Sequence, residues 1–337
     1  MEDEATVARA KERKVIVVGA GVAGRAAANA LHDLGVAVVL VDRSLSPQGV
    51  DCPVDDGLLV TIGANVVGAE SDDRYRLELE SMQGGCRQRS VQEADAVILA
   101  TGLMPIDAGL IPEFGMGWRR DVISAPQLLA MLESEHEIRR PSDGAKVSTV
   151  VFIQCVGSRV ERRGVPYCCA VGCADSIGNA IKLKERDPSI AVYVLYIDIR
   201  TAGKGEEAMY KRARQLDVKF IRGQPALVGD AAHSDRLLVC GENTLLRELY
   251  EIPADLVVLA LGLREDPENL ELFRGLGVEL DREGLIKTGE APDQAVQTSA
   301  PGVFLAGSAS APMGAEEAAS MGAQAAHAVF AYLRSLS

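Results

Sequence analysis

The chain has 337 residues, and its 48 Asp and Glu outnumber its 35 Lys and Arg, which gives a formal net charge of −13. Such a chain has no excess of cations to neutralise phosphates, so the charge excludes a protein that binds nucleic acid mainly through its backbone. The length allows one large or two medium domains. Seven cysteines are too few for a disulfide-built scaffold, and their odd number predicts a reducing compartment with metal-binding or redox-active thiols.

Two features argue against an exported or membrane-spanning protein. Residues 1–14 are charged and lack the apolar core of a secretory signal. The longest apolar runs, such as Val15–Val18 and Val36–Val41, are far shorter than the roughly 20 residues that span a bilayer. We therefore expect a soluble, cytoplasmic protein that is not integral to a membrane.

The first patterned segment reads as a strand, a glycine turn, a helix and a second strand that ends in an acid. Val15–Val18 leads into Gly19-Ala-Gly-Val-Ala-Gly24, the alanine-rich segment Arg25–Leu34 follows, and Val36–Val41 ends at Asp42. This arrangement is typical of a dinucleotide-binding turn. The alternative is a glycine-rich turn in another α/β protein, with Asp42 as a surface residue.

Each glycine of this turn has its own physical role. Gly19 permits the tight turn, Gly21 lets a pyrophosphate approach the backbone, and Gly24 lets the helix pack close to the strand. The N–H groups at the start of the helix can bind phosphate. Asp42 can accept hydrogen bonds from ribose hydroxyls.

A polar bridge, Ser44–Asp56, separates this turn from three segments of alternating polarity. The segments are Leu58–Ile62, Asn65–Ala69 and Tyr75–Glu80. Their period of two predicts antiparallel strands.

Two later segments point to FAD as the dinucleotide. Ala94–Gly102 is a buried strand that ends in Ala-Thr-Gly, Gly302–Gly307 is another strand followed by glycine, and Pro312–Leu336 reads as a long helix of small residues. These pieces resemble flavin-dependent disulfide reductase-like proteins. Many members carry an acid at the position of Ser308, so this chain must make that contact differently. The resemblance implies FAD contacts from Gly19, Gly21, Ala23, Gly24, Asp42, Arg43, Ala100, Thr101, Gly102, Gly307 and Ser308.

Residues 146–263 read as a second nucleotide-binding half inserted into the first. Val147–Gln154 predicts a strand, Cys173–Asp187 a helix and Ala191–Ile199 a strand. Ala254–Gly262 nearly repeats Ala94–Gly102, which supports a duplicated architecture. We therefore expect a discontinuous FAD-binding domain of residues 1–145 and 264–337 around an inserted Rossmann-like domain of residues 146–263.

The turn after the first strand of the insert carries no glycine fingerprint. The strand runs into Cys155-Val-Gly-Ser-Arg159 instead. We expect the nicotinamide site of an ordinary reductase to be replaced here.

Four of the seven cysteines gather in this region, and they are Cys155, Cys168, Cys169 and Cys173. Four thiolates on one loop and helix start are what a 4Fe–4S cluster requires, because each iron takes one soft ligand. Zinc also accepts four thiolates, although adjacent cysteines are unlike its usual C-x-x-C pattern. A redox dithiol of Cys169 and Cys173 would also fit the spacing, as would buried thiols without a metal. The remaining cysteines, Cys52, Cys86 and Cys240, are singletons.

The stretch from Phe152 to Gly223 resembles the A subunit of heterodisulfide reductase. The resemblance is carried by VFIQCVGSR and PYC, by AIKLKERDPSIAVYVLYIDIRTAGKGEEAMYKRAR and VKFIRG, and later by DLVVLALG and GVFLAGSASAP. It implies a thioredoxin-reductase-like α/β flavoprotein with two dinucleotide-binding domains. Such a protein carries FAD and a 4Fe–4S cluster and passes electrons within a multi-subunit complex. No catalytic side chain is assigned.

The order of the cysteines departs from the family pattern. Cys155 and Cys168 match the first two family cysteines at the expected spacing. The family then has three residues and a Cys-Cys pair, whereas here Cys168 and Cys169 are adjacent and three residues separate them from Cys173. We expect four ligands all the same. Lys182 corresponds to a family lysine near the flavin, displaced by about one helical turn, and is otherwise an exposed helix lysine.

Charged and aromatic residues near the cysteines have two interpretations. Tyr193, Tyr196, Asp198 and Arg200 either shape the cluster or a partner surface, or only pack a strand and its edge. The loop arginines Arg159, Arg162 and Arg163 either dock an acidic partner or are ordinary loop charges.

The sequence contains no C-x-x-C-x-x-C run of the ferredoxin type, so we expect the compact form of the family. That form resembles the A subunit of sulfur-oxidising complexes, which act on lipoate-bound sulfur. The alternatives are a flavoprotein subunit of a quinone-interacting membrane-linked complex, a stand-alone pyridine-nucleotide-disulfide oxidoreductase and a flavin-bearing scaffold. Expected partners are other subunits of the complex, a lipoate-bearing carrier and a second copy of this chain. The net charge favours partners with cationic surfaces.

Overall fold

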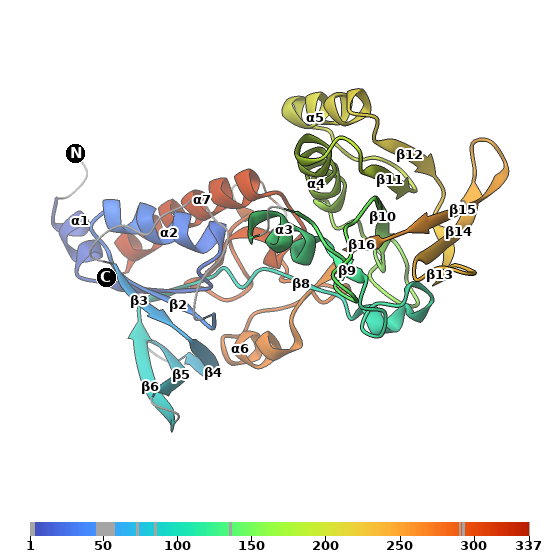
Figure 1. The fold of residues 1–337 in the computed structure, drawn as a ribbon. Helices are drawn as coiled ribbons and strands as arrows, with labels where there is room; N and C mark the ends of the chain where they lie inside the picture. Colours follow the sequence, from blue (N-terminus) through green and yellow to red (C-terminus); the bar gives the residue numbers. More distant parts are fainter. Residues whose placement is uncertain are drawn as a thin grey trace. The chain divides into compact units, whose positions relative to one another are not determined.

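The computed structural model describes residues 4–44, 58–71, 74–83, 86–134, 137–289, 291 and 294–336. The chain divides into two units, one of Met1–Met104 with Arg264–Ser337 and one of Pro105–Leu263 (Figure 1). It passes from one to the other at β8 (Met104–Pro105) and returns at β17 (Leu263–Arg264).

The first unit is built on a five-stranded sheet in the order β18-β7-β1-β2-β3, in which every neighbouring pair is parallel. The three middle strands are buried on both faces, which explains why their sequences are continuously apolar. The strands are β1 (Lys14–Val18), β2 (Ala37–Asp42), β3 (Leu59–Ile62), β7 (Ala96–Leu99) and β18 (Val303–Leu305).

The central strand of this sheet faces two different cores. Val15 and Val17 pack with helices α1, α2 and α7, whereas Ile16 and Val18 pack with the antiparallel sheet β4-β5-β6 and with α6. Helices α2 and α7 lie side by side although they come from opposite ends of the chain (Figure 1). The elements are α1 (Glu4–Lys11), α2 (Val22–Asp33), α6 (Leu270–Gly275), α7 (Ala315–Ser335), β4 (Ala64–Ser71), β5 (Tyr75–Gln83) and β6 (Cys86–Ala94).

The second unit repeats this plan. Its sheet β12-β11-β10-β16-β9 is also parallel throughout, with helices α3, α4 and α5 on one face and the antiparallel sheet β13-β14-β15 on the other. The strands are β9 (Val122–Ser124), β10 (Thr149–Val156), β11 (Ala191–Tyr196), β12 (Lys219–Arg222), β13 (Pro225–Asp230), β14 (Leu237–Asn243), β15 (Glu248–Ala254) and β16 (Leu256–Leu261). The helices are α3 (Ala125–Ser134), α4 (Gly172–Arg186) and α5 (Lys204–Gln215), and short 3₁₀ turns lie at Ala108–Leu110, Pro112–Phe114, Pro267–Asn269 and Gly307–Ala309.

The internal repeat has a structural purpose, because its aspartate ties neighbouring strands together in each unit. Asp95 accepts a hydrogen bond of 2.9 Å from the N–H of Lys14, at the start of β1. Asp255 likewise accepts bonds of 2.9 Å from the N–H groups of Ser148 and Thr149, at the start of β10. Both carboxylates are buried, and a buried strand end needs such partners for its backbone groups.

The expected strands and helices of the two halves are present, with two differences in their arrangement. Leu58–Ile62 was expected in an antiparallel sheet, but β3 pairs in parallel with β2 at the edge of the main sheet. Alternation predicts a strand and does not specify its neighbour. The first division lies after Met104 and not after residue 145, because β9 pairs with β16 and α3 packs into the core of the second unit.

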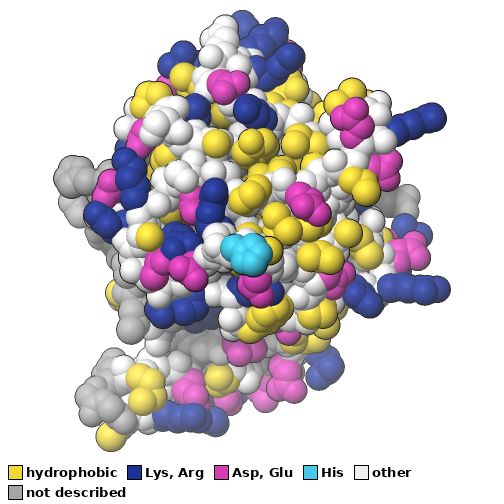
Figure 2. All heavy atoms as spheres, turned by 45° about the vertical axis from the view of Figure 1, so that its right-hand side comes forward, with side chains coloured by type: hydrophobic (Ala, Val, Ile, Leu, Met, Phe, Trp, Pro, Cys, Tyr) yellow, Lys and Arg dark blue, Asp and Glu magenta, His cyan; other side chains and the backbone are white. Residues whose placement is uncertain are grey.

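The surface and the helices bear on the expected partners and location. On the face shown in Figure 2, acidic and basic side chains are interspersed with hydrophobic ones, so the negative charge does not form one continuous patch there. None of the helices in the described ranges is both long and apolar enough to cross a membrane.

Asp255 offers a test of this repeat. Burial favours a higher pKa for Asp255, but the bonds from Ser148 and Thr149 and the charge of Arg236 hold that pKa below its ordinary value. The carboxylate therefore stabilises the fold above about pH 4, and this stability is lost as the pH falls through the lowered pKa.

We expect Asp255→Ala to lower the free energy of unfolding of the second unit by about 1–3 kcal/mol at pH 7, because the N–H groups of Ser148 and Thr149 lose a buried, charged acceptor. The difference from the unsubstituted chain should shrink as the pH falls below about 4. Urea unfolding followed by circular dichroism at both pH values measures it, with the exposed Asp235→Ala as the control. Equal urea midpoints for the two variants at pH 7 would contradict the assigned role.

Candidate functional site

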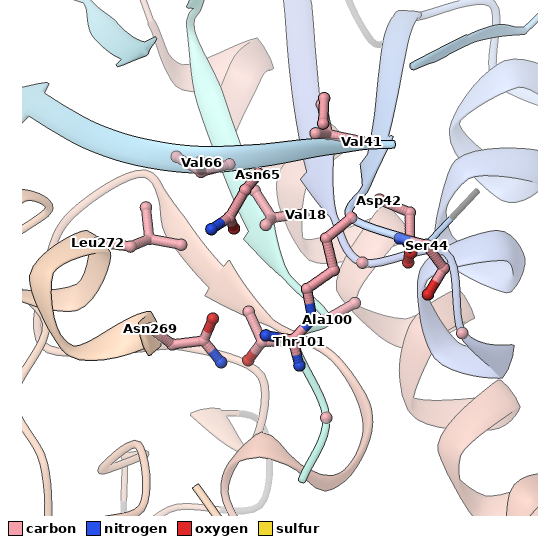
Figure 3. A pocket seen from close by; sticks show the side chains of 15 residues that line it. Val18, Val41, Asp42, Ser44, Asn65, Val66, Ala100, Thr101, Asn269 and Leu272 are labelled. Carbon is pink, nitrogen blue, oxygen red and sulfur yellow. Dashed lines mark hydrogen bonds between the residues drawn. The ribbon is translucent and has the colours of Figure 1, made fainter. Parts of the chain in front are cut away.

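A pocket of about 260 Å³ lies in the first unit, beside the ends of β1, β2 and β7 (Figure 3). The carboxyl ends of parallel strands are where open α/β sheets bind their ligands. The lining includes seven of the residues predicted to contact a dinucleotide, and these are Gly19, Gly21, Asp42, Arg43, Ala100, Thr101 and Gly102.

The three glycines of the turn differ in what a side chain would meet. A Cβ atom on Gly19, whose φ is +107°, would lie 2.2 Å from the carbonyl oxygen of Ala100, and one on Gly24 would lie 1.8 Å from the carbonyl oxygen of Gly19. A Cβ atom on Gly21 would meet nothing within 4 Å. Gly19 and Gly24 are therefore required by the fold, whereas Gly21 keeps open the space into which a ligand can enter.

Asp42 and the start of α2 complete the charged part of this turn. The Asp42 carboxylate accepts hydrogen bonds from the N–H groups of Ala20 at 2.6 Å and Ser44 at 2.7 Å. Helix α2 has Gly21 as its N-cap, with no capping side chain and no acid in its first turn. Its N–H groups and dipole therefore favour an anion at this end of the helix.

The structure also brings the predicted residues from the end of the chain to this turn. A Cβ atom added to Gly102 would lie 3.7 Å from the Oγ atom of Ser308. One added to Gly307 would lie 2.7 Å from the Cβ atom of Ala23. The hydroxyl oxygen of Thr101 is buried and has no hydrogen-bond partner within the described ranges. A buried polar atom at the wall of a pocket is a natural contact for a polar ligand.

The sequence did not identify two amides that line the same pocket. Asn65 projects from β4 and Asn269 from the turn Pro267–Asn269 (Figure 3). Glu265 orients the second amide by accepting its Nδ2–H at 2.8 Å, and burial raises the pKa of Glu265 to about 7. Lone asparagines outside a motif give no sequence signal, and the pattern around Asn65 indicates only a strand. Arg43 reaches the pocket and pairs with Asp266.

In the second unit, the equivalent central strand ends in a distorted backbone. The pairing of β10 with β16 shifts between Ile153 and Val156, and Cys155 takes a φ of +57°. A bulge of this kind re-aims a side chain, and a positive φ is strained for a residue other than glycine. Gln224 supports the bulge by donating to the carbonyl oxygens of Gln154 and Cys155 at 3.2 Å each.

The four predicted cysteines lie on the bulge of β10 (Cys155), in the loop before α4 (Cys168 and Cys169) and at the start of α4 (Cys173). Burial raises the pKa values of Cys155 and Cys169, and it raises the pKa of Cys173 to about 11. Repulsion from Cys168 adds to each of these pKa shifts. Among the described side chains, no three His, Cys, Asp or Glu are placed to hold a metal ion.

Each sulfur also has a hydrogen-bond donor beside it. The N–H of Ala170 donates to Cys168 at 3.4 Å, and the Arg159 guanidinium lies beside Cys155. The backbone N–H groups of Gly172 and Arg200 act to lower the pKa values of Cys169 and Cys173 against the larger effect of burial, and the N–H of Val171 donates to the Cys169 carbonyl oxygen at 2.7 Å. Such donors stabilise negative charge on sulfur, as thiolate ligands of a metal centre require.

Gly172 explains how Cys169 fits this arrangement. A Cβ atom on Gly172 would lie 3.0 Å from the Cys169 sulfur. The sulfur of Cys169 therefore fills the space that a side chain at position 172 would take.

Of the other residues singled out in the sequence, Asp198 lies next to the four cysteines, and Arg163 and the three remaining cysteines lie elsewhere in the chain. Asp198 forms an ion pair with Arg159 at 2.9 Å, and its carbonyl oxygen lies 3.7 Å from the Cys173 sulfur. Arg163 pairs with Glu113. Cys86 is exposed on β6, Cys240 lies on β14, and Cys52 is outside the described residues.

Lys182 is exposed on α4 of the second unit, where it lines a cavity with residues of α3. Burial raises the pKa of Asp175 in this cavity, and the charge of Lys182 lowers it. The predicted contact of Lys182 with a flavin stays a prediction.

Comparisons with known proteins agree with this geometry. Residues 200–325 match the family model of pyridine nucleotide-disulphide oxidoreductases, and residues 14–58 match that of glucose inhibited division protein A. Over 239 residues, 69% of this chain, the sequence is 42% identical to the iron-sulfur A subunit of CoB–CoM heterodisulfide reductase from Methanocaldococcus jannaschii. This chain is a homologue of the heterodisulfide reductase A subunit. A second such subunit, from the H2/formate-dependent complex of Methanococcus maripaludis, is 41% identical over 69% of this chain.

The chain covers 36% of the length of each of these two heterodisulfide reductase subunits. Solved structures confirm the thioredoxin-reductase-like fold. T. acidophilum thioredoxin reductase has a TM-score of 0.62 at 18% identity, with 95% of this chain and 99% of that chain covered. A NAD-dependent persulfide reductase from A. fulgidus has a TM-score of 0.59 at 16% identity, with 94% and 59% covered. The fold is therefore that of two-domain dinucleotide-binding oxidoreductases.

Proposed function

We propose that the chain is an electron-transfer subunit of a heterodisulfide reductase-like complex, with FAD in the first unit and a 4Fe–4S cluster in the second. The observation that carries the proposal is the set of four cysteines between β10 and the start of α4, of which Cys155, Cys169 and Cys173 are buried. Homology to the heterodisulfide reductase A subunit supports the class of complex.

The residues of the first unit fit FAD. Gly21 leaves space at the start of α2 for a pyrophosphate, and the N–H groups of that helix would hold it. Asp42 would accept hydrogen bonds from ribose hydroxyls, and the hydroxyl of Thr101, which has no partner in the described ranges, would form a hydrogen bond with the ligand. Ser308, beside Gly102, would take the place of the acid that many relatives have.

Four thiolates suit either zinc or a cluster, and the resemblance to the heterodisulfide reductase A subunit favours the cluster. Within the described ranges, no three His, Cys, Asp or Glu are placed to hold one ion. A cubane spreads its ligands over four irons, with one sulfur for each. FAD would supply an electron pair and the cluster would accept single electrons, while the protein positions and insulates both.

A dithiol mechanism at Cys169 and Cys173 is disfavoured by their surroundings. Both thiols are buried, and burial raises the pKa of Cys173 to about 11. Thiol exchange needs an accessible thiolate, so neither cysteine suits an exchange reaction. A cluster is compatible with the same burial, because a metal takes the proton's place on sulfur.

We further propose that the complex oxidises lipoate-bound sulfur. The support is the family resemblance of Phe152–Gly223, and the proposed partners are the other subunits, a lipoate-bearing carrier and a second copy of this chain. The alternative, a quinone-interacting complex, differs in the donor that would reduce the flavin.

We expect that a substitution at one site removes the cofactor of that site and leaves the other cofactor bound. Gly21→Val would fill the open space of the first pocket, so we expect loss of FAD with full iron. Cys155→Ser and Cys168→Ser should lose iron and acid-labile sulfide but keep FAD. Anaerobic purification with flavin, iron and sulfide assays measures this, and Cys240→Ser is the matched control. Full iron content in both cysteine variants would refute the cluster.

Moving one sulfur tests the fourth ligand. Cys169→Ala should lose most of the iron, and the double variant Cys169→Ala with Gly172→Cys should recover it, because a side chain at 172 enters the same space. Iron content and electron paramagnetic resonance after reduction measure the recovery. Cys169→Ala with undiminished iron would remove Cys169 from the ligand set.

The choice of electron donor tests the reaction. In the purified complex, a carrier protein bearing lipoate-bound persulfide should bleach the flavin absorbance within a turnover, and a quinol should not. Bleaching by the quinol alone would favour the quinone-interacting alternative, and in both cases the cofactor assignments would stand.

A further inference from the structure

Three polar side chains around the four cysteines are buried without a partner. Gln154 is 1% exposed, and Ser158 and Ser176 are 0% exposed. The Nε2 atom of Gln154 and the Oγ atoms of both serines have no hydrogen-bond partner in the described part of the chain. A buried donor left unpaired costs about 1–3 kcal/mol, so three such groups in one region require a ligand that pairs with them.

Their positions place two of these groups beside the sulfurs. Ser158 follows the bulge, and its backbone N–H donates to the carbonyl oxygen of Cys155 at 3.3 Å, which holds the serine next to that cysteine. A Cβ atom added to Gly172 would lie 3.0 Å from the Cys169 sulfur and 3.7 Å from the Oε1 atom of Gln154. The Gln154 amide group therefore lies near Cys169, and Ser158 lies next to Cys155.

Ser176 approaches from the helix. It stands three residues after Cys173 and four after Gly172 on α4, and residues at these spacings share one face of a helix. All three are buried, so this face is turned to the interior where Cys173 lies. The exposed serines of the second unit, such as Ser234, have no such position.

We propose that Gln154, Ser158 and Ser176 donate hydrogen bonds to sulfur atoms of the cluster and hold its reduction potential up. The inference rests on the proposed function, since it requires a cluster at the four cysteines. Reduction adds one electron to the cluster and breaks no bond, so the added negative charge remains on iron and sulfur. Donors aimed at these sulfurs stabilise the reduced state more than the oxidised state.

The test compares variants that remove one donor each and keep its volume. Ser158→Ala, Ser176→Ala and Gln154→Met are purified anaerobically as full chains, with Ser234→Ala as the matched control. Each donor variant should keep its iron and sulfide and have a lower midpoint potential in a titration followed by electron paramagnetic resonance. We expect about a tenfold fall in the reduction equilibrium constant, which is about 59 mV for a one-electron couple.

A second measurement separates a donor from a packing effect. In deuterated buffer, pulsed electron paramagnetic resonance detects exchangeable deuterons coupled to the reduced cluster, and Ser158→Ala should lose one of them. Unchanged potentials in all three variants would overturn the inference, and so would loss of iron from all three with unchanged unfolding. Absence of iron and acid-labile sulfide from the anaerobically purified, unsubstituted chain would instead overturn the proposed function, so the two failures are distinguishable.

Discussion

Both candidate sites depend on how the backbone leaves the central strand of a parallel sheet. After β1 the chain turns at Gly19, with a φ of +107°, and near the end of β10 the backbone is distorted at Cys155, with a φ of +57°. Glycine adopts such a conformation without steric cost, whereas a cysteine needs its surroundings to hold it there. The second unit provides that support through Gln224, which bonds two consecutive carbonyl groups of the bulge. The strained position has the effect of directing a sulfur into the site.

The two units show how one plan yields two kinds of binding. Each has five parallel strands in the same spatial order, helices on one face, an antiparallel sheet on the other and an aspartate that ties the central strand. They differ in the connection to the next helix. Only three residues lie between Val18, the end of β1, and Val22, the start of α2, whereas α4 begins at Gly172, far beyond the end of β10 at Val156. The short connection presents backbone N–H groups to an anion, and the long one has room for cysteines.

Sequence reasoning succeeded where one residue type has one physical role. Gly19, Gly21 and Gly24 were assigned different roles, and their surroundings differ as those roles demand. It failed where a pattern is shared by several structures. The alternation of Leu58–Ile62 does not reveal that β3 pairs with β2, and nothing in the local sequence marks Asn269 as part of a pocket. Such contacts come from tertiary packing, which brings distant segments together.

The order of the cysteines also shows that the sequence alone does not reveal which residues lie close together. In the sequence, Cys169 looks displaced from the family pattern, because the residue at 172 is glycine. In three dimensions the displacement nearly vanishes, since the Cys169 sulfur occupies the space next to the missing Cβ atom of Gly172. A ligand set is defined by where its sulfur atoms lie, and two backbone positions can deliver a sulfur to one place. Gly172 and Cys169 are therefore one feature of this site: the absence of a side chain at the first makes room for the sulfur of the second.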